Sequence, residues 1–285
     1  MEIFVLLMIF IIGTVFGSFF TLAVYRIPLG KNITHERSFC PECNHRLEFL
    51  DLIPVFSYIF LKGKCRYCGK KVRPRYLILE TLSGIVFVLA YISMKINIQD
   101  IANLYLGVNT NNTMEKLIYL LAFICFYTTN ALIIGIDKEY KNINKKVLIF
   151  GIIMQTLYML YLYIVEKVNI YRYGIYLIIM FILCMISIKN KNVGADASVR
   201  LNGKTKTYIL QNLIYLTYIM TFINNLNIIF IIILTTICVW IGYFLNNKKN
   251  VGVAPQGDPK KQQPIGFYLG ISSIIIVLIQ NFIIL

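Results

Sequence analysis

The first apolar run of the chain reads IFVLLMIFIIGTVFGSFFTLAVY, from Ile3 to Tyr25, and it contains no charged residue. An α-helix rises about 1.5 Å per residue, so about 20 apolar residues cross the hydrocarbon layer of a bilayer. The run has no basic stretch before it, unlike a secretory signal peptide, and cationic residues follow it directly. We therefore expect it to remain in the membrane as the first helix.

Similar apolar runs recur along the rest of the chain. Uncharged segments cover 117–136, 147–165, 173–188, 207–247 and 262–285, and a further span at 76–94 carries Glu80 near its start. The segment 207–247 is too long for one crossing, and Asn224, Asn225 and Asn227 near its middle predict a turn. The sequence thus predicts an all-α polytopic membrane protein with about eight transmembrane helices.

Composition and charge distribution narrow the function classes. The chain of 285 residues is 58% hydrophobic and 14% charged, where a soluble globular protein carries about 25% charged residues, so a water-soluble enzyme is excluded. With the N-terminus outside, 24 of the 28 Lys and Arg residues fall in inner loops, as short cytoplasmic loops require. These loops are 26–75, 137–146, 189–206 and 248–261. The net charge of +15 therefore reflects topology in the cytoplasmic membrane, and we expect no nucleic-acid partner.

The asparagine-rich segment 95–116 falls on the outer side in this topology. It shows no periodic apolar face, so we expect a solvated connection.

The large inner loop contains two pairs of closely spaced cysteines. Cys40 and Cys43 form one C-x-x-C pair, and Cys65 and Cys68 form a second one after twenty-one intervening residues. Four thiolates from two such pairs suit a tetrahedral structural Zn²⁺ site. Two disulfides are the alternative, but a reducing cytosol disfavours them. We expect the metal to contribute much of the folding free energy of this loop, because the loop has little core of its own.

Two carboxylates stand at the ends of apolar runs. Asp137 ends the run 117–136, and Asp196 follows the run 173–188 after Val193-Gly194-Ala195. Both are predicted at the same membrane face, where a pair of carboxyl groups can share one proton and act as base and acid on a scissile peptide. The alternative is that each one caps a helix or lies at the interface as an ordinary surface group.

Several motifs occur in a fixed order along the chain: Gly17-Ser18-Phe19 with Tyr25-Arg26-Ile27-Pro28, the cysteine pairs with Ile53-Pro54, Ser57, Gly63, Arg75-Tyr76 and Glu80, then Ile136-Asp137 with Ile143-Asn144, and finally Pro264-Ile265-Gly266-Phe267. In order and spacing these motifs resemble the type IV prepilin leader peptidases, a family of membrane aspartic proteases that are also N-methyltransferases. The resemblance implies that Asp137 and Asp196 are the catalytic pair.

The motif around the second aspartate departs from the family pattern, because Ala195 precedes the acid and Ser198 stands in place of a lysine. The string Gly257-Asp258-Pro259-Lys260 is a competing match for that motif, but Asp196 has the helical hairpin that the family places after its second aspartate.

The resemblance also implies an activity, a cofactor and partners. The protein would cleave type IV prepilin or pseudopilin precursors in the lipid bilayer and methylate the new N-terminus from S-adenosylmethionine. Residues 1–95 would form the methyltransferase part, with Glu80, Gly17 and Ser18 as cofactor-binding residues, and residues 96–285 the peptidase part. Pairing of Glu80 with Arg75, and close helix packing at Gly17 and Ser18, are alternative roles. A transporter, or an assembly platform that has lost its protease, remains the alternative function.

Overall fold

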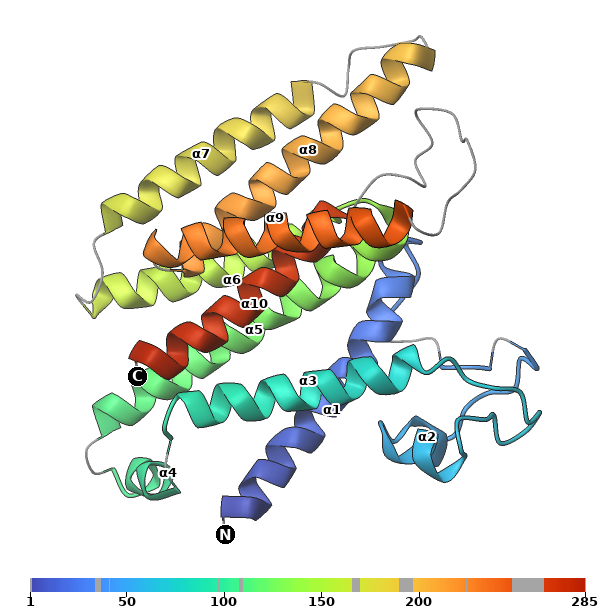
Figure 1. The fold of residues 1–285 in the computed structure, drawn as a ribbon. Coiled ribbons are helices and arrows are strands. Elements are labelled where there is room, and N and C mark those ends of the chain that lie inside the picture. The colour runs from blue at the N-terminus through green and yellow to red at the C-terminus, as the bar shows by residue number, and fades with distance from the viewer. Residues whose placement is uncertain are drawn as a thin grey trace. The chain divides into compact units, whose positions relative to one another are not determined.

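The computed structural model describes residues 2–33, 37–40, 42–96, 98–107, 110–165, 170–189, 197–223, 225–247 and 264–284 (Figure 1). The regular elements in these ranges are helical: α1 (Glu2–Arg26), η1 (Phe49–Leu52), α2 (Phe56–Phe60), α3 (Arg75–Ser93), α4 (Ile98–Tyr105), α5 (Thr110–Tyr140), α6 (Lys145–Ile164), α7 (Ile170–Lys189), α8 (Ala197–Phe222), α9 (Asn225–Asn247) and α10 (Ile265–Ile284).

The long helices coincide with the apolar runs of the sequence. Within the described ranges, eight helices have 19 or more residues. Five of them, α1, α3, α5, α6 and α10, are long and apolar enough to cross a membrane, and shorter apolar stretches lie in α7 and α9. The all-helical class with several possible membrane helices is therefore confirmed, while eight crossings and the cytosolic side of the large loop stay predictions.

Two connections test the expected turns. The predicted break in 207–247 is confirmed, because α8 ends at Phe222 and α9 begins at Asn225. The prediction that 95–116 lacks a periodic apolar face is wrong, since α4 and the start of α5 lie within it. Apolar residues at 98, 101, 104 and 105 recur at helical spacing, which outweighs the asparagines between them. Helix α8 also begins at Ala197, before the apolar run at 207, because a helix can extend with polar residues beyond an apolar segment.

The chain forms two compact units, Met1–Leu120 and Leu121–Ile284. In the first unit α1 crosses and packs against α3 (Figure 1). A β-carbon added at Gly13 would lie 2.8 Å from Gly84 Cα, and one added at Gly17 would lie 2.8 Å from Glu80 Cα. The crossing therefore depends on glycines that let two backbones approach, as small residues do between membrane helices.

In the second unit α8 packs against α6, α7 and α10, and α9 packs against α10. Polar side chains also join α5 to this group: Asn130 Oδ1 accepts hydrogen bonds from Tyr215 and from Ser273 Oγ, the latter at 3.1 Å. Helix α5 ends where Lys141 adopts a φ of 51°, and Asn144 then caps α6 by accepting from Lys146 N at 2.9 Å. This turn leaves Asp137 in the last turn of α5.

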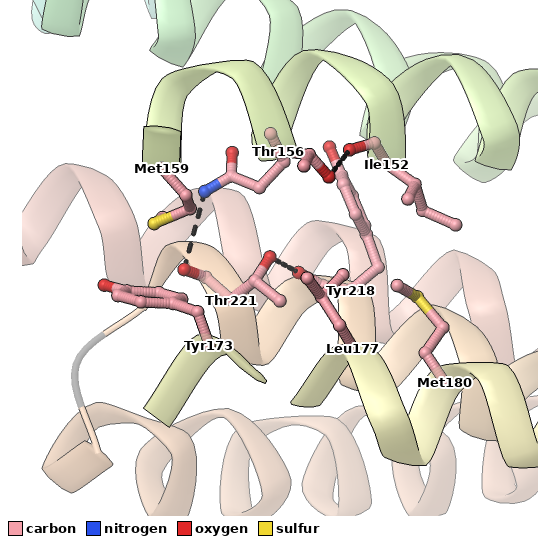
Figure 2. A pocket seen from close by; sticks show the side chains of 9 residues that line it. Ile152, Thr156, Met159, Tyr173, Leu177, Met180, Tyr218 and Thr221 are labelled. Atoms are coloured by element: carbon pink, nitrogen blue, oxygen red, sulfur yellow. Dashed lines mark hydrogen bonds between the residues drawn. The ribbon is translucent and has the colours of Figure 1, made fainter. Parts of the chain in front are cut away.

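A small pocket between α6, α7 and α8 is lined mainly by apolar side chains (Figure 2). Three of its polar side chains bind backbone carbonyl groups: Gln155 donates to Thr221 O at 3.4 Å, Thr156 to Ile152 O and Thr221 to Tyr218 O. These bonds satisfy the hydrogen-bonding groups of the three side chains within the helices. We assign the pocket no chemistry.

Candidate functional site

The four cysteines of the large loop come from two knuckles of matching local structure. In the first, Cys40 N donates to His45 O and Asn44 N to Cys40 O; in the second, Cys65 N donates to Lys70 O and Gly69 N to Cys65 O. The residue after the second cysteine of each pair is left-handed, with φ of 55° at Asn44 and 68° at Gly69. Asparagine and glycine tolerate that conformation best, so the local sequence favours both turns.

The knuckles bring the four sulfur atoms together. The Sγ atoms of Cys40, Cys43, Cys65 and Cys68 all lie within 4.8 Å of one another, and all four cysteines are free. A tetrahedral Zn²⁺ with Zn–S bonds of about 2.3 Å needs sulfur atoms about 3.8 Å apart, and Cys40 Sγ lies 4.0 Å from Cys68 Sγ. The donor set and its spacing therefore fit a structural zinc ion, and the two-disulfide alternative is not adopted.

Hydrogen bonds favour the thiolate form of one ligand. Burial alone raises the pKa of the Cys40 thiol, but hydrogen bonds from the backbone N–H groups of Cys43 and Glu42 and from neighbouring thiols bring its pKa down to about 7. Metal ligation requires thiolates, and N–H groups directed at sulfur stabilise them.

Side-chain contacts hold the two knuckles and η1 together around the sulfur cluster. Lys70 of the second knuckle pairs with Glu42 of the first, and the rings of His45 and Tyr67 contact each other with centroids 3.6 Å apart and planes tilted by 31°. Arg66 Nε lies 2.7 Å from Asp51 Oδ1, which ties the second knuckle to η1. These contacts are mostly exposed and each stabilises the loop little, so the cysteine cluster is its main organising element.

A second group of polar residues lies where α1 meets α3. Glu80 is 8% exposed, its Oε2 accepts from Val55 N at 2.8 Å, and it hydrogen-bonds to the Ser18 side chain. Val55 has a φ of 64°, which is strained for a β-branched residue, and it precedes α2. Glu80 therefore fixes the loop to the helix pair. Gly17 lies against the α3 backbone, which is the close helix packing named above as the alternative to a cofactor-binding role.

The carboxylate of Asp137 forms the centre of a third group, in the second compact unit. Asp137 is 0% exposed, and it accepts hydrogen bonds from Tyr208 Oη at 2.8 Å and from Phe267 N at 3.0 Å. Tyr208 Oη also accepts from Ile265 N at 2.9 Å. The carboxylate thus lies at the N-terminus of α10, where free N–H groups and the helix dipole stabilise a negative charge. It caps a helix, as the alternative interpretation held, and it is also fixed in one orientation.

The remaining predicted acid is not placed. Asp196 lies outside the described residues, as does the competing Asp258, so the pairing of Asp137 with a second carboxylate stays a prediction.

Sequence reasoning missed two residues that face Asp137, namely Tyr208 and Asn212 of α8. Asn212 is buried and its Oδ1, like Asp137 Oδ2, would lie 3.2 Å from a β-carbon at Gly266. The signal was present as two polar residues four positions apart in an uncharged run, which share one helix face.

Comparison with known proteins identifies the N-terminal region. Residues 11–94 match the bacterial peptidase A24 N-terminal domain. The chain is 41% identical over 88 residues to a prepilin leader peptidase/N-methyltransferase of Klebsiella pneumoniae, covering 29% of this chain and 39% of the relative. It is 38% identical over 91 residues to the protein of the same name from Bacillus subtilis (strain 168), covering 32% of this chain and 37% of the relative. It is 38% identical over 79 residues to the protein of the same name from Myxococcus xanthus (strain DK1622), covering 28% of this chain and 24% of the relative.

The predicted resemblance to prepilin leader peptidases is thereby confirmed for this region. The matches span well under half the length of these relatives. The region 11–94 contains Gly17, Ser18, Glu80 and the four cysteines, whereas Asp137 lies beyond it. No solved structure matches the chain.

Proposed function

We propose that the protein is a membrane aspartic endopeptidase that removes the short basic leader of type IV prepilin or pseudopilin precursors, and that it methylates the new N-terminus. The observation that carries the peptidase proposal is the buried Asp137 carboxylate, held in one orientation by Tyr208 and α10. Ionisable groups at membrane depth are costly and mark functional sites. The similarity of residues 11–94 to the prepilin leader peptidases supports the substrate class.

In this proposal Asp137 acts as the general base toward water, and Asp196 acts as the acid toward the leaving amine. A precursor lying in the membrane with its basic leader in the cytosol presents its scissile bond at the inner interface. The charge distribution supports an N-terminus outside and the large loop inside, which directs the last turn of α5 to that interface.

Zinc has a structural role in this proposal. Cys40, Cys43, Cys65 and Cys68 would hold it, and it would supply folding free energy to the loop 26–75 and not chemistry at the peptide.

The methyl donor does not fit the predicted cofactor residues as they are arranged. The α3 backbone fills the space beside Gly17, and the Glu80 carboxylate is engaged by Val55 N and Ser18. We therefore derive no step through S-adenosylmethionine. Methylation, and its assignment to residues 1–95 with proteolysis in 96–285, is proposed on the similarity of the N-terminal region to proteins named prepilin leader peptidase/N-methyltransferase.

The decisive experiment incubates the purified, membrane-reconstituted protein with a short prepilin peptide, with and without S-adenosylmethionine, and measures the products by mass spectrometry. We expect cleavage by the wild type and a loss of at least about 10³-fold in Asp137→Asn, because an amide cannot take a proton from water. Glu139→Gln is the matched control, since Glu139 is an exposed carboxylate in the same helix.

Three outcomes would contradict the proposal or part of it. Normal cleavage by Asp137→Asn would exclude this residue as the base. Absence of cleavage by a folded, metal-containing wild type would favour an assembly platform. Cleavage without any mass increase in the presence of S-adenosylmethionine would remove the methyltransferase activity.

A further inference from the structure

Two short helices of the large loop carry large apolar side chains on their surface. Phe49 of η1 is 80% exposed, and Phe60 of α2 is 81% exposed. The two helices pack against each other, so their exposed side chains belong to one region of the loop. A group of exposed apolar side chains of this size marks a surface that contacts a protein or a lipid bilayer. We call the six exposed apolar residues of the two helices the apolar patch: Phe49, Leu50, Leu52, Phe56, Ile59 and Phe60.

Helix α2 directs its apolar face outward because the opposite face is used for packing. Its three patch residues lie three and four positions apart, so they share one face of the helix. Tyr58 lies on the other face, where its ring packs against Gly63 and its hydroxyl donates to Val72 O at 3.4 Å. The tyrosine thus fixes α2 to the segments that flank the second knuckle, and the apolar face remains exposed.

The contact between Glu80 and Val55 sets the position of α2 along α3. Val55 directly precedes α2, and its N–H donates to the Glu80 carboxylate, so α2 begins beside the first turns of α3 (Figure 1). Glu80 lies five residues after Arg75, the first residue of α3, which corresponds to about 7.5 Å along the helix. Helices that lie in a membrane interface bury their apolar face about 5–10 Å into the boundary of headgroups and acyl chains. Since α3 is apolar and long enough to cross a membrane, α2 begins at the depth of that boundary.

The chain that follows the patch carries charge of one sign. Between Ile53 and Arg75 it contains seven basic and no acidic residues. Lys62 and Lys64, directly after α2, are both exposed. The acid within η1, Asp51, is paired with Arg66. Basic side chains next to an exposed apolar surface attract anionic lipid headgroups, while the apolar groups enter the acyl chains.

We propose that the apolar patch docks on the anionic lipid surface of the membrane that α1 and α3 cross, with Lys62 and Lys64 among the headgroups. Depth and charge favour lipid over a soluble protein partner, because α2 already lies beside the end of a membrane helix. Docking would hold the four-cysteine cluster at the membrane surface. The inference rests on α1 and α3 crossing the membrane, as proposed, and it does not depend on the peptidase activity.

The test measures the depth of position 60 in the full-length protein, reconstituted in vesicles. The single tryptophan of the chain is removed by Trp240→Phe, and Phe60→Trp supplies a fluorescent probe. The vesicles contain phosphatidylcholine with phosphatidylglycerol, or phosphatidylcholine alone, and part of the lipid carries bromine near the top of its acyl chains. In the anionic vesicles we expect the bromine to quench the probe and aqueous acrylamide to have little access to it.

Two kinds of control are matched to this measurement. Arg46→Trp, in the same background, places the probe at an exposed position of the first knuckle, where acrylamide and not bromine should quench it. Lys62→Gln and Lys70→Gln each remove one positive charge, but Lys70 is paired with Glu42. Measured with the probe at position 60, Lys62→Gln should lower the ratio of docked to undocked loops by about 5-fold, because a basic group near an anionic surface contributes about 1 kcal/mol. Lys70→Gln should change this ratio much less.

Each alternative gives a different result. A probe at position 60 that acrylamide reaches and bromine does not would show that the patch faces water. A probe shielded from both quenchers would show that protein covers the patch, either another part of this chain or a partner. Equal bromine quenching at positions 46 and 60 would exclude the patch as the docking surface, and equal quenching in the two lipid compositions would exclude recognition of anionic headgroups.

Thermal unfolding shows whether each variant is folded. If Phe60→Trp does not fold, Phe49→Trp replaces it, because Phe49 is equally exposed and belongs to the same patch. Peptide cleavage is measured on the same vesicles. Cleavage without quenching at position 60 would refute the docking alone, whereas quenching without cleavage would refute the proposed peptidase and leave the docking established.

Discussion

Substitution of Gly17 by alanine tests the close crossing of α1 and α3. The new β-carbon would lie 2.8 Å from Glu80 Cα and 2.9 Å from Ser83 Cβ. Carbon atoms pack at about 3.5–4.0 Å, so the helices must separate by roughly 0.7 Å or more. Overpacking of this kind costs about 1–3 kcal/mol, and the better helix propensity of alanine offsets about 0.5–1 kcal/mol of that. We expect a net destabilisation of about 1–2 kcal/mol.

The assay is thermal unfolding of the purified full-length protein in detergent, followed by circular dichroism and by exposure of buried thiols. A loss of 1–2 kcal/mol corresponds to a melting temperature lower by about 4–12 °C for a unit of this size. Separation of the helices also moves Glu80 away from Val55, so thiols of the loop should become reactive at a lower temperature than in the wild type.

Gly174→Ala in α7 is the control, because a β-carbon there meets nothing within 4 Å. Its stability should be unchanged or higher by up to about 1 kcal/mol. If Gly17→Ala melts at or above the wild-type temperature, the backbones of α1 and α3 do not meet at Gly17, and the packing argument for this residue is wrong.

Three further variants test the metal and carboxylate groups. We expect metal analysis to find one equivalent of Zn²⁺ in the wild type and none in Cys65→Ser. Equal, near-zero metal in both proteins with reactive thiols would exclude the site. The double variant with Cys43→Ser and Cys68→Ser should disorder the loop and abolish methylation first. Mass spectrometry should still detect peptide cleavage, because the later helices are held by their own packing. Simultaneous loss of both activities in a stably inserted protein would refute a division at about residue 95. Gly266→Ala should lower kcat by at least about 10-fold with the protein folded, since its β-carbon would stand 3.2 Å from Asp137 Oδ2 and displace the carboxylate. An unchanged kcat would show that cleavage does not depend on the position of this carboxylate.

Features that depend on local spacing were accessible from the sequence. The cysteine pairs were predicted because four thiols at two short spacings have few other uses, and the apolar runs predicted the long helices because their length matches a bilayer. Asp137 was found because a carboxylate that ends an apolar run is unusual. In each case the evidence lies within a few tens of residues.

Features that depend on packing between distant segments were not accessible. Tyr208 and Asn212 look like ordinary polar residues of a membrane helix, and only the fold brings them to a carboxylate on α5. The anchoring of Val55 by Glu80 was missed for the same reason, because neither the strained φ nor the hydrogen bond has a sequence signature. Helix α4 was missed because its asparagines outweighed a short apolar repeat.

The hydrogen-bond donors of Asp137 come from segments that are synthesised well after Asp137 itself. Tyr208 follows Asp137 by 71 residues, and Phe267 follows it by 130. A ribosome therefore makes the start of α10 only 130 residues after Asp137, and until then the acid has no N–H donors from that helix. The hydrogen bonds that fix the Asp137 carboxylate therefore form late in synthesis, once both α8 and the start of α10 have been made.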